Sequence, residues 1–212
     1  MPDLPVPFDE QVTPWRAWSP AEARDRLRLV RVAGGAPLRW AVAGGWAVDL
    51  HLGHETRPHS DLEITVVDRD VPALLAAFTA PHWRWVVPHE GMLHATDSPA
   101  LGQTHQVWLW SEDEQAFVLD VFREPHGDAT WVCRRDERIT LPWDQVVERT
   151  PDGVPYLAVE TVLLFKAKHL RPKDVGDLES VLPTLDADRR RWLREAVEQV
   201  HPGHAWSGLL RN

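Results

Sequence analysis

Hydrophobic and polar residues follow two different periods along this chain, and the change between them divides it into two parts. Up to about residue 154, short apolar stretches with the two-residue alternation of β-strands stand between helical segments. From about residue 155 the apolar positions take helical spacing, and Leu157, Val162, Leu163 and Phe165 form one stripe. The pattern predicts a mixed α/β part over residues 1–154 and a mainly helical part over residues 155–212.

The first part is expected to alternate helices and strands around a double glycine. Four prolines among residues 1–18 predict an extended arm. A helix should follow over residues 19–34, with Ser19 as its N-cap, Pro20 in its first position and Gly34 at its end. The other elements expected before residue 80 are a buried strand over 38–45, a short helix over 46–53, a strand over 60–68 and a helix over 70–78.

Strands dominate the middle of the chain, where Gly, Pro and acidic residues mark the turns. They are predicted over 84–90, 92–97, 105–112 and 116–124, followed by a strand pair within 130–147. In the helical part, Pro172 interrupts the pattern, which resumes over 173–182 and ends in a helix over 186–200 with Asp186 as N-cap.

Two acidic residues share one face of the strand that follows the double glycine. Asp61 and Glu63 are two positions apart, so their Cα atoms lie roughly 6.6 Å apart on the same side. Such a pair fits a solvated strand face, but it also fits Mg²⁺, which takes carboxylate oxygens together with substrate phosphates. Asp120 favours the metal interpretation, because it lies within an apolar strand where an unpaired charge is costly.

The double glycine supplies a second half of a possible site. Gly44 and Gly45 end a strand and begin a helix, so their backbone N–H groups are accessible and the helix dipole favours an anion there. A double glycine alone is commonly only a turn. Here it precedes Asp61 by 16 residues, close enough for a phosphate chain on the turn to reach metal ions on the strand.

The stretch GGWAVDLHLGHETRPHSDLEI resembles the signature of small antibiotic nucleotidyltransferases of the DNA polymerase β superfamily. The similarity is greatest to the aminoglycoside 2''-O-nucleotidyltransferases, with lincosamide nucleotidyltransferases nearby. The shared pattern covers twelve positions at fixed spacing, namely Gly44, Gly45, Trp46, Ala47, Asp49, Leu52, Gly53, Thr56, Arg57, His59, Asp61 and Glu63. Residues 117–120, FVLD, resemble the strand that carries the third acid of the family, and residues 163–182 resemble a C-terminal helical segment of related members.

This resemblance implies a polymerase β-like α+β fold, a mixed sheet with flanking helices, as a nucleotidyltransferase domain over 1–154 and a helical domain over 155–212. It implies Asp61, Glu63 and Asp120 as catalytic Mg²⁺ ligands, Gly44 and Gly45 at the triphosphate, and Asp120 or a nearby carboxylate as the proton acceptor. ATP is the expected donor and a small-molecule hydroxyl the acceptor. The chain departs from the family at Glu63, where members usually have Asp, which puts the rate or the preferred metal in question.

Other residues allow two interpretations each. Arg57 could contact a phosphate or an acid, or form a structural salt bridge to Asp49 or Glu55. His59 could orient a ligand carboxylate or simply pack. Lys166 is predicted to contact the triphosphate, the alternative being a surface lysine with a buried stem.

Several further residues are interpreted more narrowly. Lys173, Asp174 and Asp177 are expected mainly to tie helices together. Trp108 and Trp110 alternate on one strand and could wall a substrate pocket, and the single cysteine, Cys133, is expected to be inert.

Composition narrows the classes of partner. The net charge of −9 over 212 residues argues against a nucleic-acid duplex and suits a cationic small molecule. One cysteine, an N-terminus without the pattern of a secretory signal and the lack of an apolar run of roughly 18 residues predict a cytoplasmic protein that does not enter a membrane.

Three functions remain open at this point. The first is transfer of a nucleotide to a small molecule such as an aminoglycoside-like antibiotic. The second is a toxin-type or protein-modifying nucleotidyltransferase, for which the negative charge makes RNA the less attractive target. The third is a catalytically silent nucleotide-binding module, which only Glu63 favours.

Overall fold

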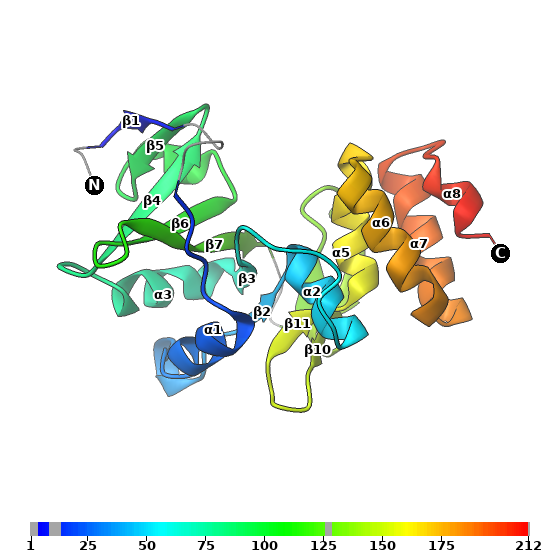
Figure 1. Ribbon diagram of the computed structural model, residues 1–212, viewed down its shortest axis with the longest axis horizontal. Helices are drawn as coiled ribbons and strands as arrows, with labels where there is room; N and C mark the ends of the chain where they lie inside the picture. The colour runs from blue at the N-terminus through cyan, green and yellow to red at the C-terminus, as the bar shows by residue number, and fades with distance from the viewer. Residues whose placement is uncertain (1–3, 9–13, 126–128, 212) are drawn as a thin grey trace.

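The structure is a computed structural model that describes residues 4–8, 14–125 and 129–211 (Figure 1). Its strands are β1 (Val6–Pro7), β2 (Trp40–Val42), β3 (Glu63–Val67), β4 (Trp83–His89), β5 (Met92–Ala95), β6 (Gln106–Ser111), β7 (Ala116–Glu124), β8 (Thr130–Val132), β9 (Thr140–Pro142), β10 (Val147–Arg149) and β11 (Pro155–Leu157). Its α-helices are α1 (Pro20–Leu27), α2 (Gly44–Leu52), α3 (Val71–Ala77), α4 (Trp143–Val146), α5 (Val159–Lys166), α6 (Pro172–Val181), α7 (Ala187–Val200) and α8 (Trp206–Leu209).

Nine of these strands form one mixed sheet in the order β1-β5-β4-β6-β7-β3-β2-β11-β10, and β8 and β9 form a separate pair. The pairs β3–β7 and β2–β11 are parallel, and the other pairs in the sheet are antiparallel. The parallel pair β3–β7 lies at the centre of the sheet and joins segments that are more than fifty residues apart in the sequence. An α+β fold with a mixed sheet and flanking helices, as the sequence predicts, is therefore present.

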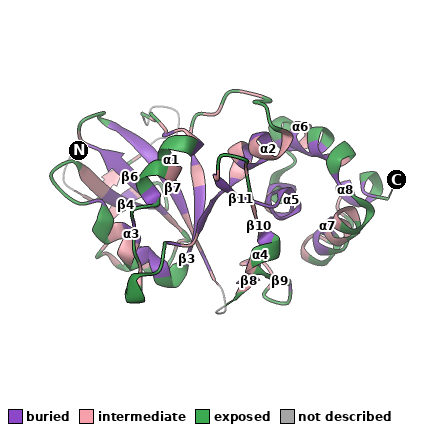
Figure 2. Cartoon of the chain, turned by 90° about the horizontal axis from the view of Figure 1, so that it is seen from below, coloured by how far each residue is buried: buried purple, intermediate pink, exposed green. Residues whose placement is uncertain are grey.

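The helices divide between two parts of the molecule. Helices α1 and α3 lie over the strands of the N-terminal part, whereas α5, α6, α7 and α8 lie beyond the β10–β11 edge, with α2 between them and the sheet (Figure 1). Helix α5 packs against α2, α6 and α7. The central strands are mostly buried, and α1 and α4 expose one side to solvent (Figure 2).

One large hydrophobic core runs through both parts of the chain. It contains Leu62 and Ile64 around the central strand as well as Leu163 and Leu193 of the C-terminal helices. Full burial of such side chains contributes about 1.5–3 kcal/mol each, so a continuous core holds the helices firmly on the sheet. Among the described residues, no helix is long and apolar enough to cross a membrane.

Two predicted boundaries differ from the structure. The helix expected to reach Gly34 ends at Leu27, because the chain then turns back on itself through Gly34 and Gly35, both with φ near +80° (79° and 78°). The strand expected over 60–68 begins only at Glu63, so Asp61 lies on the approach to the strand. The caps at Ser19 and Asp186 form as predicted.

The boundary expected after residue 154 falls inside a hairpin. Strand β11 pairs with β10 on one side and with β2 on the other, so residues 155–157 belong to the main sheet. Leu157 lies in this strand, and the helical part begins with α5 at Val159. The short helix α4 between β9 and β10 is not visible in the apolar pattern.

Candidate active site

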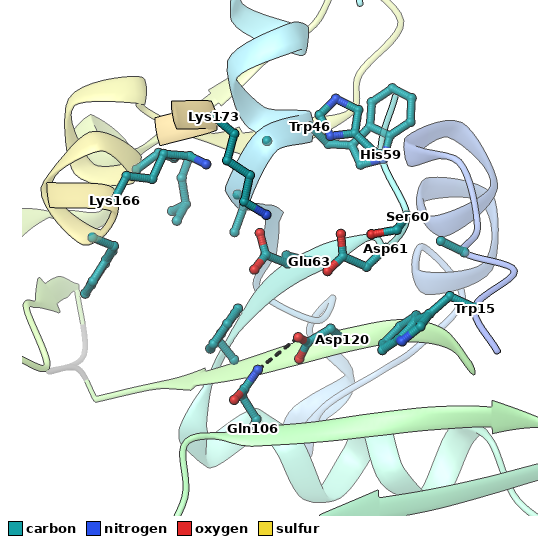
Figure 3. A pocket seen from close by; sticks show the side chains of 18 of the residues that line it. Trp15, Trp46, His59, Ser60, Asp61, Glu63, Gln106, Asp120, Lys166 and Lys173 are labelled. Carbon is teal, nitrogen blue, oxygen red and sulfur yellow. Dashed lines mark hydrogen bonds between the residues drawn. The ribbon is translucent and has the colours of Figure 1, made fainter. Parts of the chain in front are cut away.

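Three carboxylates face one cavity from the centre of the sheet. Glu63 and Asp120 are register partners on the parallel strands β3 and β7, and the Asp120 amide donates to the Leu62 carbonyl at 2.9 Å. Parallel partners point to the same side, and Asp61, two residues before Glu63, points there as well (Figure 3). The spacing along the sequence predicts that Asp61 and Glu63 share one face. The pairing of β3 with β7 brings Asp120, the expected third acid, to the same face.

Burial perturbs two of these acids. Asp120 is only 4% exposed, and burial, followed by the charges of Glu63 and Asp61, raises its pKa well above the ordinary value. Burial and the Asp61 charge also raise the pKa of Glu63, while Lys166, Lys173 and Arg171 act in the opposite direction. Such acids hold protons or a cation more readily than exposed ones.

Asp120 also has a neutral partner that sequence analysis did not identify. The Gln106 amide donates through Nε2 to Asp120 Oδ2 at 2.9 Å, whereas no hydrogen-bond partner for Oδ1 is found among the described residues. Gln106 lies on β6, the neighbour of β7, and only the register of the two strands brings it close. It fixes one oxygen of Asp120 and leaves the other for a ligand.

The double glycine lies directly against these acids. A Cβ at Gly44 would come within 1.5 Å of Glu63 Oε2, and the residue has a positive φ of 62°. A Cβ at Gly45 would lie 2.4 Å from Arg57 Nη2. Helix α2 begins here, and its N-cap, Ala43, makes no side-chain capping bond, so the first amides of the helix have no capping side chain where Gly44 and Gly45 line the cavity.

His59 and Arg57 lie against Gly45 and line the same cavity. His59 is hydrogen-bonded through Nε2 to Asp49 Oδ2 at 2.5 Å and stacks on Trp46 with ring centroids 4.6 Å apart. This contact supports the packing interpretation of His59. The salt bridge expected from Arg57 to Asp49 or Glu55 is not the one observed, because Arg57 reaches Asp177 on α6 at 3.4 Å.

Lys166 is buried within an ion-pair network. Its Nζ lies 2.7 Å from Asp177 and 3.5 Å from Asp174, and its side chain is 10% exposed. Arg171 pairs with Asp174 at 2.7 Å. The surface-lysine interpretation is therefore wrong, and Asp174 and Asp177 tie α6 to α5 as expected. Lys166 still borders the cavity, so a phosphate contact stays a prediction.

The cavity has a volume of about 1490 Å³, and its charges are divided between two regions. The three carboxylates occupy the middle (Figure 3), and the glycine turn lines the same cavity. A basic wall lies on the side of the C-terminal helices and consists of Arg134, Arg135, Lys166, Lys168, His169, Arg171 and Lys173. All three lysines of the chain are in this wall, although the protein carries a net charge of −9.

Arg134 and Arg135 come from the turn after β8 and have no motif that marks them in the sequence. The Arg134 guanidinium lies over Phe122 and Phe165, at 4.7 and 4.3 Å from the ring centroids, and pairs with buried Glu124. Arg135 lies over the same Phe165 ring at 5.0 Å. Because only folding brings β7, α5 and this turn together, the sequence alone could not assign them to the site.

The acids fit a hard divalent cation in donor type. Among the described residues, no group of three or more His, Cys, Asp or Glu side chains is already drawn together as a metal centre. However, Asp120 keeps a buried oxygen without a hydrogen-bond partner, and Asp61 and Glu63 add carboxylate oxygens on the same face. Oxygen donors of this kind suit Mg²⁺. Cys133 is buried and free, in line with an inert role.

Comparison with known proteins supports the resemblance found in the sequence. A family model for aminoglycoside-2''-adenylyltransferase matches residues 27–84, which include the glycine turn, Asp61 and Glu63. No curated protein matches the chain. The family that this model describes is one of nucleotidyltransferases, and the matched segment includes the residues on which the sequence resemblance rests.

Solved structures show the same fold. A crystal structure of ANT(2'')-Ia in complex with adenylyl-2''-tobramycin has a TM-score of 0.55 at 16% identity, covering 85% of this chain and 93% of that one. A solution structure of antibiotic-resistance factor ANT(2'')-Ia has a TM-score of 0.52 at 16% identity, covering 90% of each chain. The predicted nucleotidyltransferase fold is thereby confirmed. A lincomycin-bound lincosamide antibiotic adenylyltransferase, LnuA, matches with a TM-score of 0.49 at 18% identity, over 70% of this chain and 88% of that one.

Proposed function

We propose that the protein is a Mg²⁺-dependent nucleotidyltransferase that moves AMP from ATP to a hydroxyl group of a small, amine-bearing molecule such as an aminoglycoside antibiotic. The observation that carries this proposal is the convergence of Asp61, Glu63 and Asp120 beside Gly44. Acids on adjacent strands next to an uncapped helix start combine a cation site with an anion site. Transfer of a nucleotide needs both at the same place.

The basic wall would hold the polyphosphate end of the donor. Amides at the start of α2 can donate to phosphate oxygens, and Lys173 and Arg171 lie close enough to Glu63 to lower its pKa. Lys168 and Arg135 extend the positive potential along the cavity. These groups attract the nucleotide and stabilise the pyrophosphate as it leaves.

Asp61, Glu63 and Asp120 would hold the Mg²⁺. When bound, Mg²⁺ neutralises phosphate charge and fixes the phosphates for in-line displacement. Glu63 reaches further than the usual Asp, and Gly44 leaves room for its carboxylate, since a Cβ there would overlap Oε2. This fit supports an active site rather than a silent nucleotide-binding module.

The chain's own residues would position the acceptor and receive its proton. The acceptor hydroxyl oxygen forms a bond to the α-phosphorus while the bond from that phosphorus to the bridging oxygen breaks. Pyrophosphate leaves with that electron pair, and the hydroxyl proton passes to Asp120 or a carboxylate beside it. Asp120 suits this step because its carboxylate is buried beside Asp61 and Glu63 and keeps one oxygen without a hydrogen-bond partner among the described residues.

The test is direct. The protein is incubated with Mg²⁺, ATP and a panel that includes tobramycin and lincomycin, and pyrophosphate release is measured together with the mass of each drug. We expect a gain of one AMP on an amine-bearing drug, lost in Asp61→Ala and Asp120→Ala but retained in Asp113→Ala, an exposed acid far from the cavity lining. Turnover by folded Asp61→Ala or Asp120→Ala protein would show that the site is assigned wrongly.

A further inference from the structure

The segment before α1 extends the sheet beside the catalytic strand. Strand β3 pairs with β7 only from Asp120 onward, which leaves the first half of β7 open on that side. Residues 14–18 fill this place, because Phe117 N donates to Pro14 O at 2.9 Å, Arg16 N to Phe117 O at 2.9 Å and Trp18 N to Val118 O at 3.0 Å. Residues 14–18 therefore lie beside the part of β7 that leads to Asp120.

A bulge in the sheet turns an aromatic group toward the same face as Asp120. Trp108 is the register partner of Asp120, and the register shifts between Leu109 and Trp110, so Phe117 instead of Val118 faces this side. Trp15 forms a parallel β-bridge with Phe117. The centroid of its ring lies 5.4 Å from that of Phe117 and 5.3 Å from that of Trp108.

These rings belong to a second hydrophobic cluster, separate from the main core, that the N-terminal residues complete. Within it Trp108 is only 7% exposed, whereas Trp15 remains partly exposed and lines the cavity. Of the two rings, Trp15 is therefore the one with a face available to a ligand. Of the two tryptophans on β6 that could wall a substrate pocket, Trp108 lines the cavity. Trp110 packs against Phe117, with ring centroids 5.0 Å apart.

The two regions on either side of the acids differ in chemistry. Lys166 and Lys173 lie on one side of the carboxylates, and Trp15 and Ser60 lie on the other (Figure 3). In displacement at phosphorus, the entering and leaving oxygens lie roughly in line on opposite sides. If pyrophosphate leaves toward the basic wall, the acceptor hydroxyl must enter from the Trp15 side.

The charges on the Trp15 side suit a cation. Glu22 borders the cavity there, and hydrogen bonds from the Ser19 amide and hydroxyl hold the pKa of its carboxyl below the ordinary value. Arg16 also lines the cavity, and its guanidinium pairs with Glu114 at 3.6 Å. An indole face attracts an ammonium group more strongly than other aromatic rings do.

Building on the proposed function, we propose that Trp15 forms one wall of the acceptor subsite and selects hydroxyl compounds that carry a protonated amine. The amine would lie over the Trp15 ring with Glu22 and Asp61 nearby, which places the neighbouring hydroxyl beside Asp120. Trp15 is thus a specificity-determining residue, supplied by a segment that precedes the catalytic strands by more than forty residues.

The experiment compares wild type, Trp15→Ala and Trp15→Phe with tobramycin as acceptor and Mg²⁺–ATP as donor. We expect Trp15→Ala to raise the KM for tobramycin about tenfold or more and to leave the KM for ATP within about twofold, with Trp15→Phe in between. Trp143→Ala is the matched control, because Trp143 is also partly buried but does not line the cavity. Equal KM values for tobramycin in wild type and Trp15→Ala would overturn the proposal.

A second measurement separates the amine contact from a packing effect. N-acetylation of tobramycin removes its charge, so it should weaken wild-type binding about tenfold and Trp15→Ala binding far less, by titration calorimetry with a non-hydrolysable ATP analogue present. An equal loss of affinity in wild type and Trp15→Ala would overturn the proposal. If Trp15→Ala is unstable, Trp15→Phe replaces it in this comparison.

The calorimetry also distinguishes this inference from the proposed function. Absence of transfer by wild type, together with tobramycin binding that is lost in Trp15→Ala, would refute the proposed function and support the subsite. Transfer by wild type with unaltered Trp15→Ala kinetics would refute the subsite alone. Neither transfer nor tobramycin binding by wild type would refute both.

Discussion

Glu63 and Asp120 stand opposite each other on parallel neighbouring strands, and among the described residues no lysine or arginine forms an ion pair with either of them. Burial and the charge of Glu63 raise the pKa of Asp120, and burial and the charge of Asp61 raise that of Glu63. A protein maintains such an arrangement at a cost to its stability, which makes sense where a cation or a proton has to be bound.

Gln106 should matter for rate more than for nucleotide binding. Its amide holds one oxygen of Asp120 at 2.9 Å, so Gln106→Ala frees the carboxylate to rotate away from the acceptor. We expect kcat to fall about tenfold to a hundredfold with little change in the KM for ATP, as positioning effects of this kind allow. The control is Gln103→Ala, an exposed glutamine on the preceding loop. A change confined to KM would contradict the positioning role.

Gly44 should tolerate no side chain. A Cβ would lie 1.5 Å from Glu63 Oε2, so Gly44→Ala must displace either Glu63 or the start of α2. We expect activity to fall at least about a hundredfold, because both the acid and the phosphate-binding amides would shift. Gly53→Ala is the matched control, since Gly53 has a similar positive φ of 76° but open space around it. That variant should lose about 1 kcal/mol of stability and keep its kcat.

The site was predictable from sequence only where its residues are close together in the chain. Gly44, Gly45, Asp61 and Glu63 lie within twenty residues, and the two-residue period of a strand places the acids on one face. Asp120 could also be predicted, because an unpaired charge within an apolar strand is costly unless it binds a partner. The sheet order, with β7 beside β3, then confirms the expected proximity.

Residues brought in by tertiary contacts could not be found in this way. Gln106 acts through a cross-strand register, Arg134 through stacking on Phe122 and Phe165, and Trp15 through a bridge to Phe117. None of these contacts has a periodic signal in the sequence. The helix expected to end at Gly34 stops earlier, at Leu27, and the chain then turns at Gly34 and Gly35, where Gly35 N donates to Val32 O at 3.0 Å.

Two lysines of the basic wall should respond differently to removal. Lys173 is exposed and points toward the acids, so Lys173→Ala should raise the KM for ATP about tenfold and leave thermal stability unchanged (Figure 3). Lys166 is buried against Asp177 and Asp174, so Lys166→Ala should cost about 3–5 kcal/mol by leaving buried carboxylates short of a partner. Equilibrium unfolding and steady-state kinetics on both variants distinguish a ligand contact from a structural ion pair.

Glu148 should make the stability of the protein depend on acid pH. It joins three elements, since the Tyr156 hydroxyl donates to it at 2.8 Å, Arg189 of α7 lies 2.8 Å away and His51 of α2 lies 3.6 Å away. The interaction with His51, followed by the hydrogen bond from Tyr156 and the charge of Arg189, lowers the pKa of Glu148 to about 2. Together these effects outweigh burial, which raises it. A carboxyl whose pKa is lowered by folding stabilises the protein above its ordinary pKa near 4.5, and this stabilisation is lost as the pH falls toward 2.

The comparison of Glu148→Gln with wild type measures this contribution. The variant should be less stable by about 1–2 kcal/mol at pH 6, because solvent screens part of the charge interaction at this half-buried position. At pH 3 the difference should shrink, because Glu148 of the unfolded wild-type chain is then protonated while Glu148 of the folded protein is still mostly ionised. Urea denaturation at the two pH values gives both differences, with the exposed Glu137→Gln variant as control. A difference that stays the same or grows at pH 3 would show that the ionised form of Glu148 does not hold α2 and α7 to the sheet.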